Sequence, residues 1–588
     1  MYIRFISVIK KPHFMKHPPD HKLIIYQVLV RLAGNTHSNN KQHGTLEENG
    51  CGKFNDLSPA FLDAVKDFGA THIWLTGVLE HATCTDYSEY GIAPDNPLVV
   101  KGRAGSPYAI KDYYDVCPDL AVDVKARMRE FEDLVKRCEY AGLGAIIDFV
   151  PNHVARHYES DGKPRGVTDF GKQDDPARAF SPSNNYYYLP GQELCLPEEV
   201  QHLPYVQDAR PKPYRESPAR ATGNDQFHQC LSVHDWYETV KLNYGVDYQD
   251  HRKKYFDPLP DTWHKMYDIL LFWAQKGVSG FRCDMAEMVP VEFWNWVIPK
   301  VKEKYPHILF IAEIYNPAAY RDFIHTGRFD YLYDKMGLYD TLRAVVEQQQ
   351  PAFAITDTWK ALEGIAPQML RFMENHDEQR MASHHFAGTP AAGVPATTVS
   401  ALIHQGPLMV YFGQETGEGA DGPAGFSGED GRTTIFDYFS VPSFQRWYHH
   451  GQCDGAMLTS EEKQLRQFYH ELLHLARHPV ITHGHFYDIM WDNHQDSGFN
   501  PHHCYAFLRW DAQHTWLVVA NFHPRDAMSI DIRIPGHFAE VSGRKPLTQG
   551  KAELLLQGLL PQQTPAEVLN GKIRAHIGPF STIVLSLS

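Results

Sequence analysis

Short apolar runs recur along the chain, and longer segments with a helical pattern lie between them. Each run has five to eight residues, and short, continuously apolar runs are typical of parallel strands that are buried on both faces. We expect eight of these strands, at residues 23–30, 71–75, 144–150, 280–284, 308–313, 329–333, 368–374 and 407–412.

The intervening segments place apolar residues at every third or fourth position, which is the period of an amphipathic helix. Two of them, at residues 122–141 and 257–276, end just before a glycine, a residue that favours helix termination. Strands that alternate with helices favour parallel βα units. Eight such units predict the α/β class and a closed (β/α)8 barrel, the TIM-barrel fold.

Two stretches break this alternation. Residues 151–255 contain ten prolines and are far longer than an ordinary strand-to-helix connection, so we expect an irregular domain inserted after strand 3. Beyond a helix expected at residues 460–477, alternating runs predict a C-terminal antiparallel β-domain. We expect a catalytic barrel in two parts, at residues 1–150 and 256–478. The inserted domain B is expected at residues 151–255, and a C-terminal β-sandwich domain at residues 479–588.

Composition narrows the choice of partners and compartment. The 588 residues include 56 Lys and Arg against 71 Asp and Glu, a formal net charge of −15, which argues against nucleic-acid binding because phosphate backbones attract basic side chains. No apolar run is long enough for a membrane span. The nine cysteines form no C-x-x-C pair, and the N-terminal MYIRFISVIKKPHF lacks the order of a secretory signal, so we expect reduced thiols and a cytoplasmic location.

Acidic residues close several of the predicted strands, at the barrel rim where such folds place their active sites. Arg282 precedes Asp284 by two positions, so the two side chains point the same way, and we expect Arg282 to lower the pKa of Asp284 and keep it ionised. Glu313 follows the next strand, where neighbouring carboxylates are expected to raise its pKa. Asp377 supplies a third carboxylate, and Asp148 is expected to be a buried supporting group. An ionised nucleophile beside a protonated acid is what retaining glycoside cleavage requires.

Four segments at the ends of predicted strands 3, 4, 5 and 7 read DFVPNH, GFRCD, IAEIYN and ENHD. In this order they resemble the four signature regions of glycoside hydrolase family 13, the α-amylase family. The segment SPYAIKDYYDV is similar to the stretch that precedes the first of these regions. The resemblance covers roughly residues 20–445 and implies an oligosaccharide or polysaccharide substrate with α-linked glucose units.

The resemblance also implies a role for each matching residue. It makes Asp284 the nucleophile, Glu313 the acid/base and Asp377 the group that stabilises the transition state. The substrate-binding residues that it implies are Tyr108, His153, Arg282 and His376. Asn152 matches one calcium ligand of the family, so the resemblance leaves calcium open as a cofactor, with Asn152 as a metal ligand.

The sequence departs from the family pattern just after the nucleophile. Many α-amylases have a Lys-His pair there that grips the acceptor sugar and helps to bind calcium, whereas this chain has Glu287 and Met288. The segment FWNWVIPKVKEKYPHILFIAE is similar to maltosyl-transferring relatives. Transfer of sugar to another sugar therefore stays open beside hydrolysis.

Other patterns favour less specific interpretations. His153 and His157 have the spacing of a zinc-binding helix, but Pro151 disfavours a helix there. The segment GEGADG at residues 417–422 matches a dinucleotide fingerprint, yet no helical pattern follows it, so we expect a loop over the rim. The aromatic clusters YYY at 186–188 and WY at 236–237 either line a sugar cleft or simply pack the inserted domain.

These observations predict a retaining α-glycosidase that acts on α-linked glucans or maltooligosaccharides through a covalent glycosyl-enzyme. An α-glucan transglycosylase, an isomerase or a phosphorolytic transferase of the same family are alternatives. A non-catalytic sugar-binding protein on the same barrel is a further alternative from another class. That last alternative is disfavoured because all three family carboxylates are present.

Overall fold

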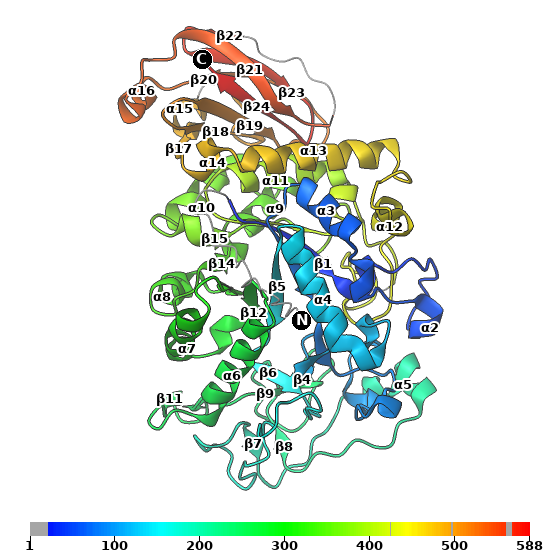
Figure 1. Ribbon diagram of the computed structural model, residues 1–588. Coiled ribbons are helices and arrows are strands. Elements are labelled where there is room, and N and C mark those ends of the chain that lie inside the picture. Colours follow the sequence, from blue (N-terminus) through cyan, green and yellow to red (C-terminus); the bar gives the residue numbers. More distant parts are fainter. Residues whose placement is uncertain (1–21, 424, 496–497, 560–566) are drawn as a thin grey trace, which may run out of the picture.

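The computed structural model, drawn in Figure 1, describes residues 22–423, 425–495, 498–559 and 567–588. All eight predicted barrel strands are present in it. The N-terminal segment MYIRFISVIKKPHF lies outside the described residues. The strands are β1 (Ile24–Leu29), β2 (His72–Thr76), β5 (Gly144–Phe149), β12 (Gly280–Cys283), β13 (Leu309–Ala312), β14 (Tyr331–Tyr333), β15 (Met369–Leu370) and β16 (Leu408–Tyr411).

These strands form one parallel sheet in the order β15-β14-β13-β12-β5-β2-β1-β16. A bridge between Arg371 and Leu408 joins β15 to β16, so the sheet curls into a nearly closed barrel and the predicted fold is confirmed. The seventh strand is much shorter than the predicted run at 368–374. Glu374, near the end of that run, accepts hydrogen bonds from Arg380 and from the Met381 N–H, and these contacts hold the chain in a loop instead.

Helices surround the barrel: α3 (Pro59–Asp67), α4 (Arg127–Tyr140), α6 (Asp261–Gln275), α7 (Val291–Lys304), α8 (Tyr320–His325), α9 (Asp340–Val346), α10 (Ile355–Ala361), α11 (Gly393–Leu402), α12 (Pro442–Tyr448) and α13 (Ser460–Ala476). Two begin later than predicted. The segment before α4 is a 3₁₀ turn that follows the exposed Val122, and α6 starts only after Pro258 and Pro260, because proline lacks the N–H that a helix interior needs.

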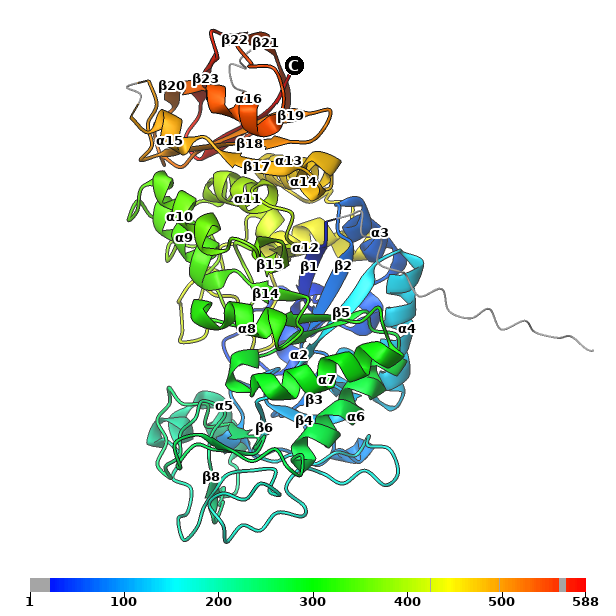
Figure 2. The same ribbon diagram turned by 90° about the vertical axis from the view of Figure 1, so that its left-hand side faces the viewer.

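The segment between β5 and α6 contains short paired strands and irregular loops. These strands are β6 (His153–Ala155), β7 (Tyr188–Leu189), β8 (Ala219–Arg220), β9 (Thr239–Lys241), β10 (Val246–Asp247) and β11 (Lys253–Lys254), with one short helix, α5 (Pro204–Ala209). β6 pairs with β9, which places His153 opposite Lys241. Figure 2 shows this inserted segment at the end of the barrel that lies away from the C-terminal sheet.

The C-terminal region forms an eight-stranded antiparallel sheet in the order β17-β18-β19-β24-β21-β22-β23-β20. The strands are β17 (His485–Asp488), β18 (Cys504–Trp510), β19 (Thr515–Asn521), β20 (Met528–Arg533), β21 (Gln549–Gln557), β22 (Glu567–Leu569), β23 (Lys572–Ile577) and β24 (Ser581–Leu587). Helices α11 and α13 separate this sheet from the barrel (Figure 1). The domain boundaries and the sandwich arrangement stay predictions.

The buried Arg509 of β18 fastens the C-terminal sheet to the barrel side. Its guanidinium group donates hydrogen bonds to the carbonyl oxygens of Ile403, Val480, Ile481 and Gly484. All nine cysteines carry free thiols. Among the described residues, every helix is too short or too polar to cross a membrane.

Candidate active site

Four acidic side chains from separate barrel strands meet at one buried arginine. Arg282 of β12 lies opposite Asp148 of β5 in the sheet register. Asp284 follows β12, Glu313 follows β13 and Asp377 lies in the loop after β15. The guanidinium nitrogens of Arg282 lie 2.8 Å from Asp284 Oδ1, 2.8 Å from Glu313 Oε1, 3.5 Å from Asp148 Oδ1 and 4.0 Å from Asp377 Oδ2. The three predicted catalytic carboxylates are therefore brought together around one cation.

Aromatic rings and a phenol fix the position of this arginine. The guanidinium carbon lies 5.2 Å from the centre of the Trp74 ring and 5.6 Å from that of Tyr333, within the range of cation–π attraction. Arg282 Nε also donates a hydrogen bond of 3.2 Å to the Tyr333 hydroxyl. The Trp74 indole donates to Asp148 Oδ2 at 3.1 Å, so Asp148 has the predicted supporting position.

Burial controls the protonation of the cluster more strongly than the sequence suggested. Arg282 lowers the pKa of Asp284, as expected, but desolvation is the larger effect and holds this pKa well above its ordinary value. The expected net lowering of the Asp284 pKa is therefore wrong. Desolvation, with Glu313 as a further contributor, also raises the pKa of Asp377 to about 8, and burial raises that of Asp148 to about 6. A cluster of four carboxyl groups around one cation retains protons that separate carboxyl groups would release.

Both carboxylate oxygens of Glu313 are held by donors. Oε1 accepts from the Tyr315 hydroxyl at 2.7 Å, and Oε2 accepts from the backbone N–H of Met285 at 2.8 Å. Met285 has a positive φ of 42°, an uncommon conformation for a side chain other than glycine. This backbone geometry turns the residue after Asp284 toward Glu313 and so links the two strand ends.

His376 lies next to the carboxylate cluster, with 1% of its surface exposed. The amide nitrogen of Gln27 donates to its Nδ1 at 2.8 Å, so Nε2 carries the ring proton. Nε2 lies 3.1 Å from Asp377 Oδ2 and is hydrogen-bonded to the Tyr108 hydroxyl. Burial lowers the pKa of His376 well below its ordinary value, and Arg282 adds to this effect, so the ring is neutral.

The three carboxylates open onto a single cavity of about 340 Å³. Its other lining residues come from the barrel rim, from the inserted segment and from the loop after β16: Lys101, Ser106, Tyr108, His153, Trp236, Glu238, Thr239, Met285, Tyr315, Phe426, Ile435 and Phe436. Tyr108 and His153 thus reach the cavity as predicted, whereas Arg282 and His376 lie behind its wall.

The inserted segment supplies one wall of the cavity. The ring of Trp236 lies 5.2 Å from that of His153, and burial lowers the pKa of His153 to about 3, which keeps this imidazole neutral. Tyr186 and Tyr187 are each only 2% exposed, so they pack the inserted segment. Of the two aromatic clusters, the one with Trp236 therefore lines the cavity, whereas the Tyr cluster at 186–188 packs the interior of the inserted segment.

Sequence reasoning missed several residues of this site. Gln27 stands as one polar residue inside an otherwise apolar strand, and that signal could have identified it. Tyr315 follows Glu313 by two positions in an extended segment, the spacing used for Arg282 and Asp284. The contribution of the Met285 N–H depends on its backbone conformation, which no local sequence pattern indicates.

Asn152 does not fit the calcium role that the resemblance implies. Its Oδ1 accepts a hydrogen bond from the ammonium group of Lys241 at 2.7 Å, and its amide nitrogen donates to the Gly223 carbonyl. Lys241 is 1% exposed and lies 2.6 Å from Asp225 Oδ1. The ammonium group of Lys241 therefore already supplies, beside this oxygen, the positive charge that a metal ion would bring between the barrel rim and the inserted segment.

Within the described residues, the two remaining sequence patterns do not form the zinc and dinucleotide geometries that their spacings resemble. His153 is buried in the cavity wall, whereas His157 is exposed and paired with Glu159. After residues 417–422 the next helix is α12, which begins at Pro442, so the phosphate-binding turn of a dinucleotide site is not formed.

Comparison with known proteins places these features in a family. The model of the α-amylase catalytic domain matches residues 47–521, which is more than half of the chain. The chain belongs to the α-amylase family.

Among curated proteins, the chain is similar to an α-1,4-glucan:maltose-1-phosphate maltosyltransferase from Cereibacter sphaeroides, with 26% identity over 228 residues, or 35% of this chain and 33% of that protein. It is also similar to α-amylase 3 from Dictyoglomus thermophilum, with 23% identity over 388 residues, or 62% of this chain and 64% of that protein. The chain spans about a third of the length of the maltosyltransferase.

Among solved structures, a noncanonic maltogenic α-amylase from Thermotoga neapolitana has a TM-score of 0.58 at 19% identity, covering 96% of this chain and 98% of that one. An Anoxybacillus α-amylase has a TM-score of 0.60 at 17% identity, covering 97% and 98%. At these identities the likeness concerns the fold alone.

We predict that Asp377→Asn stabilises the protein in a pH-dependent way. Folded Asp377 keeps its proton up to about pH 8, whereas the unfolded chain releases it near pH 4. Wild-type stability therefore falls as the pH rises from about 4 to about 8, and the amide avoids this loss. We expect a Tm roughly 3 °C or more above wild type at pH 8.5 and a gap that closes toward pH 4, measured by calorimetry.

The exposed Asp357→Asn serves as the control and should follow the wild-type curve. A Tm gap for Asp377→Asn that stays constant across the pH range would contradict this assignment.

We further predict that Lys241→Met weakens the attachment of the inserted segment. The substitution leaves Asp225 and the Asn152 oxygen without their shared cation, at an expected cost of about 3 kcal/mol in the free energy of unfolding. Denaturant unfolding measures the difference, with the exposed Lys253→Met as control, expected within about 0.5 kcal/mol of wild type. Equal stability of the two variants would show that Lys241 has no such role.

Proposed function

We propose that the protein is a retaining enzyme that cleaves α-linked glucans or maltooligosaccharides through a covalent glycosyl-enzyme. One observation carries this proposal: the two amino groups of Arg282 bind the carboxyl groups of Asp284 and Glu313, each at 2.8 Å. A single guanidinium bridge favours the short separation of retaining enzymes, about 5–5.5 Å, over the roughly 6.5–9.5 Å that leaves room for a water in inverting enzymes.

In the first step, Asp284 attacks the anomeric carbon of the sugar. Its Oδ1 is held by Arg282, whereas its Oδ2 has no hydrogen-bond partner among the described residues and is free to form the new bond. Glu313 donates its proton to the departing glycosidic oxygen, so that the carbon–oxygen bond breaks as the ester to Asp284 forms. Asp377 faces the same cavity, and its carboxylate form, once the proton that burial retains has been released, stabilises the positive charge that develops on the sugar ring.

In the second step, Glu313 removes a proton from an incoming water molecule. The water oxygen attacks the anomeric carbon from the face that the leaving group vacated, and Asp284 departs as a carboxylate. Two inversions give net retention. Tyr315 and the Met285 N–H hold Glu313 in place through both proton transfers.

The cavity wall provides flat and polar groups for a pyranose. Tyr108 and Trp236 offer ring faces, which suit the apolar faces of sugars, and the neutral His153 offers a nitrogen to a hydroxyl group. His376 acts from behind the wall by positioning Tyr108 and Asp377. The meeting of three carboxylates in one cavity also disfavours the non-catalytic sugar-binding alternative.

Transfer to a second sugar is the other candidate reaction. Met285, Phe426 and Phe436 give the cavity an apolar flank, which favours a sugar face over free water as the acceptor. The curated relatives named as maltosyltransferases point in the same direction. In this reaction, Glu313 would deprotonate a sugar hydroxyl in place of water.

The cytoplasmic location predicted from the sequence remains a proposal. It is supported by the nine free thiols, two of which, on Cys195 and Cys230, are exposed on neighbouring segments. Thiols of this kind persist in reducing compartments.

We predict that Asp284→Asn and Glu313→Gln each lower kcat on maltooligosaccharides by roughly 10²-fold or more while the fold survives. With a donor that has a good leaving group, such as a maltosyl fluoride, Glu313→Gln should recover activity when azide is added, because only the acid/base step is damaged. Asp284→Asn should not recover. Reducing-sugar release and circular dichroism measure activity and folding.

Two exposed residues on the barrel side, Asp357 and Glu363, provide matched controls. Asp357→Asn and Glu363→Gln make the same chemical changes away from the cavity and should leave kcat within twofold of wild type. Normal turnover by either cavity variant would refute the roles proposed for these carboxylates.

Product profiles separate hydrolysis from transfer. If water is the acceptor, maltopentaose gives only shorter products, whose anomeric configuration, followed by NMR, is initially α. If a sugar is the acceptor, chains longer than maltopentaose appear early in the reaction. Initial release of the β-anomer would contradict the retaining mechanism itself.

A further inference from the structure

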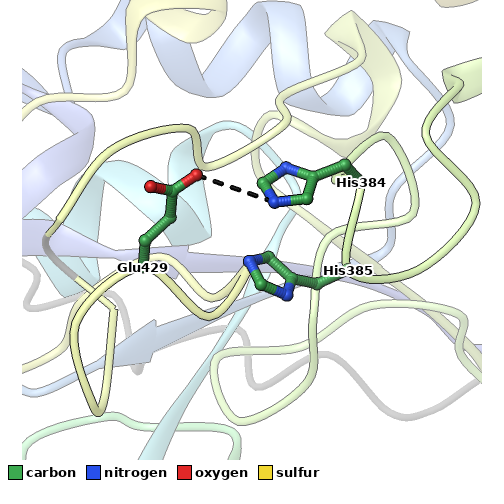
Figure 3. A group of neighbouring side chains, drawn as sticks. All are labelled: His384, His385 and Glu429. Atoms are coloured by element: carbon green, nitrogen blue, oxygen red, sulfur yellow. Dashed lines mark ion pairs between the residues drawn. The ribbon is translucent and has the colours of Figure 1, made fainter.

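Two groups of side chains outside the catalytic cluster bring three potential metal-ligand atoms within 4.8 Å of one another in the described residues. The first consists of His384, His385 and Glu429 on two loops (Figure 3). All three are exposed, and His384 lies 3.7 Å from Glu429, so these groups satisfy one another and the solvent. Nothing in this first group calls for a ligand.

The second group lies where the inserted segment meets the barrel. It consists of Glu80, Asp112 and Asp161. Glu80 is in β3 (Leu79–His81) and Asp112 in β4 (Ile110–Val116), and the two residues stand directly opposite each other in this antiparallel pair. Two like charges in that position repel each other. Asp161 comes from the loop that follows β6, at the beginning of the inserted segment.

Glu80 is a buried carboxyl group without a hydrogen-bond or ion-pair partner among the described residues. It is 1% exposed, and neither of its carboxylate oxygens has a hydrogen bond or an ion pair with a described residue. A buried carboxylate without a partner costs several kcal/mol, so native proteins pair such groups or place them against a cation. Asp112, by contrast, accepts from Ser160 Oγ at 2.5 Å and from the Gly162 N–H at 2.8 Å, both in the loop that carries Asp161.

The basic residues nearby do not neutralise this group. Arg127 binds both Asp115 and Asp161, at 2.6 Å and 3.1 Å. Lys111 is paired with Asp95 at 3.1 Å. Lys111 is therefore engaged by Asp95, and Arg127 is the cation paired within this group. With all four carboxyl groups of Glu80, Asp112, Asp115 and Asp161 ionised, four negative charges face this one positive charge, an excess of three.

We propose that Glu80, Asp112 and Asp161 bind a divalent cation, and specifically Ca²⁺. Carboxylate oxygens are the preferred ligands of this ion, and an irregular arrangement completed by water suits its flexible coordination better than the strict octahedron of Mg²⁺. Bound there, Ca²⁺ would join the β3–β4 pair to the loop at 160–162 and so fix the start of the inserted segment, which supplies a wall of the cavity. This site is separate from Asn152, where Lys241 already provides the charge.

Binding is tested on the full-length protein after treatment with a chelator. Titration of CaCl₂ in a calorimeter should give a Kd on the order of 10⁻⁵–10⁻⁴ M. A millimolar concentration of Ca²⁺ should raise the Tm by roughly 3 °C or more, because the ion binds only the folded chain. MgCl₂ at the same concentration should give a clearly smaller rise.

Glu80→Gln separates a metal site from a merely protonated glutamate. The amide removes a buried charge, so the chelated variant should be at least as stable as the chelated wild type. Its Tm should no longer respond to Ca²⁺. Asp161→Asn changes an exposed residue, so folding should tolerate it. This variant should raise the Kd for Ca²⁺ about tenfold. Because each variant is compared with itself in Ca²⁺ and in chelator, loss of the ion pair to Arg127 does not enter the comparison.

Glu429→Gln, in the exposed group of Figure 3, is the matched control and should keep the full response to Ca²⁺. The proposal is overturned if the wild type shows neither heat of binding nor a Tm shift with Ca²⁺. It is also overturned if the Glu80→Gln variant responds as the wild type does.

Discussion

The arrangement of the active site depends on one buried guanidinium group. Arg282 holds four carboxyl groups of different strands within 4.0 Å of its amino groups, and without a cation there these groups would repel one another in a region of low dielectric constant. The group is itself held by aromatic rings and by the Tyr333 hydroxyl. The parallel register of β5, β12 and β13 sets these distances, so barrel geometry and the electrostatics of the carboxylate cluster form a single constraint.

Much of this architecture follows from local sequence patterns. The eight apolar runs gave the strands, because buried parallel strands leave a strong signal, and their acidic ends gave the three carboxylates. The raised pKa of Asp284 was not predictable, because it depends on how completely the barrel excludes water. The contact between Lys241 and Asn152 joins residues 89 positions apart. Such pairings arise from the path of the inserted segment, which has no periodic pattern to read.

Charge also organises the junction between the inserted segment and the barrel. At one side of β6, Lys241 lies between Asn152 and Asp225. At the other side, the loop at 160–162 meets the acidic pair of β3 and β4. His153 lies between these two points and faces the cavity. Polar contacts therefore hold the chain at both ends of the three-residue strand that carries this imidazole, beside its pairing with β9.

At Met285, which has a left-handed backbone conformation, the main chain and the side chain have different functions. Its N–H holds Glu313, the proposed proton donor, whereas its side chain forms part of the cavity surface. This main-chain donor is present with every residue type except proline, which has no N–H. Substitutions of Met285 by residues other than proline can therefore reshape this part of the cavity surface while the main-chain hydrogen bond to Glu313 is preserved.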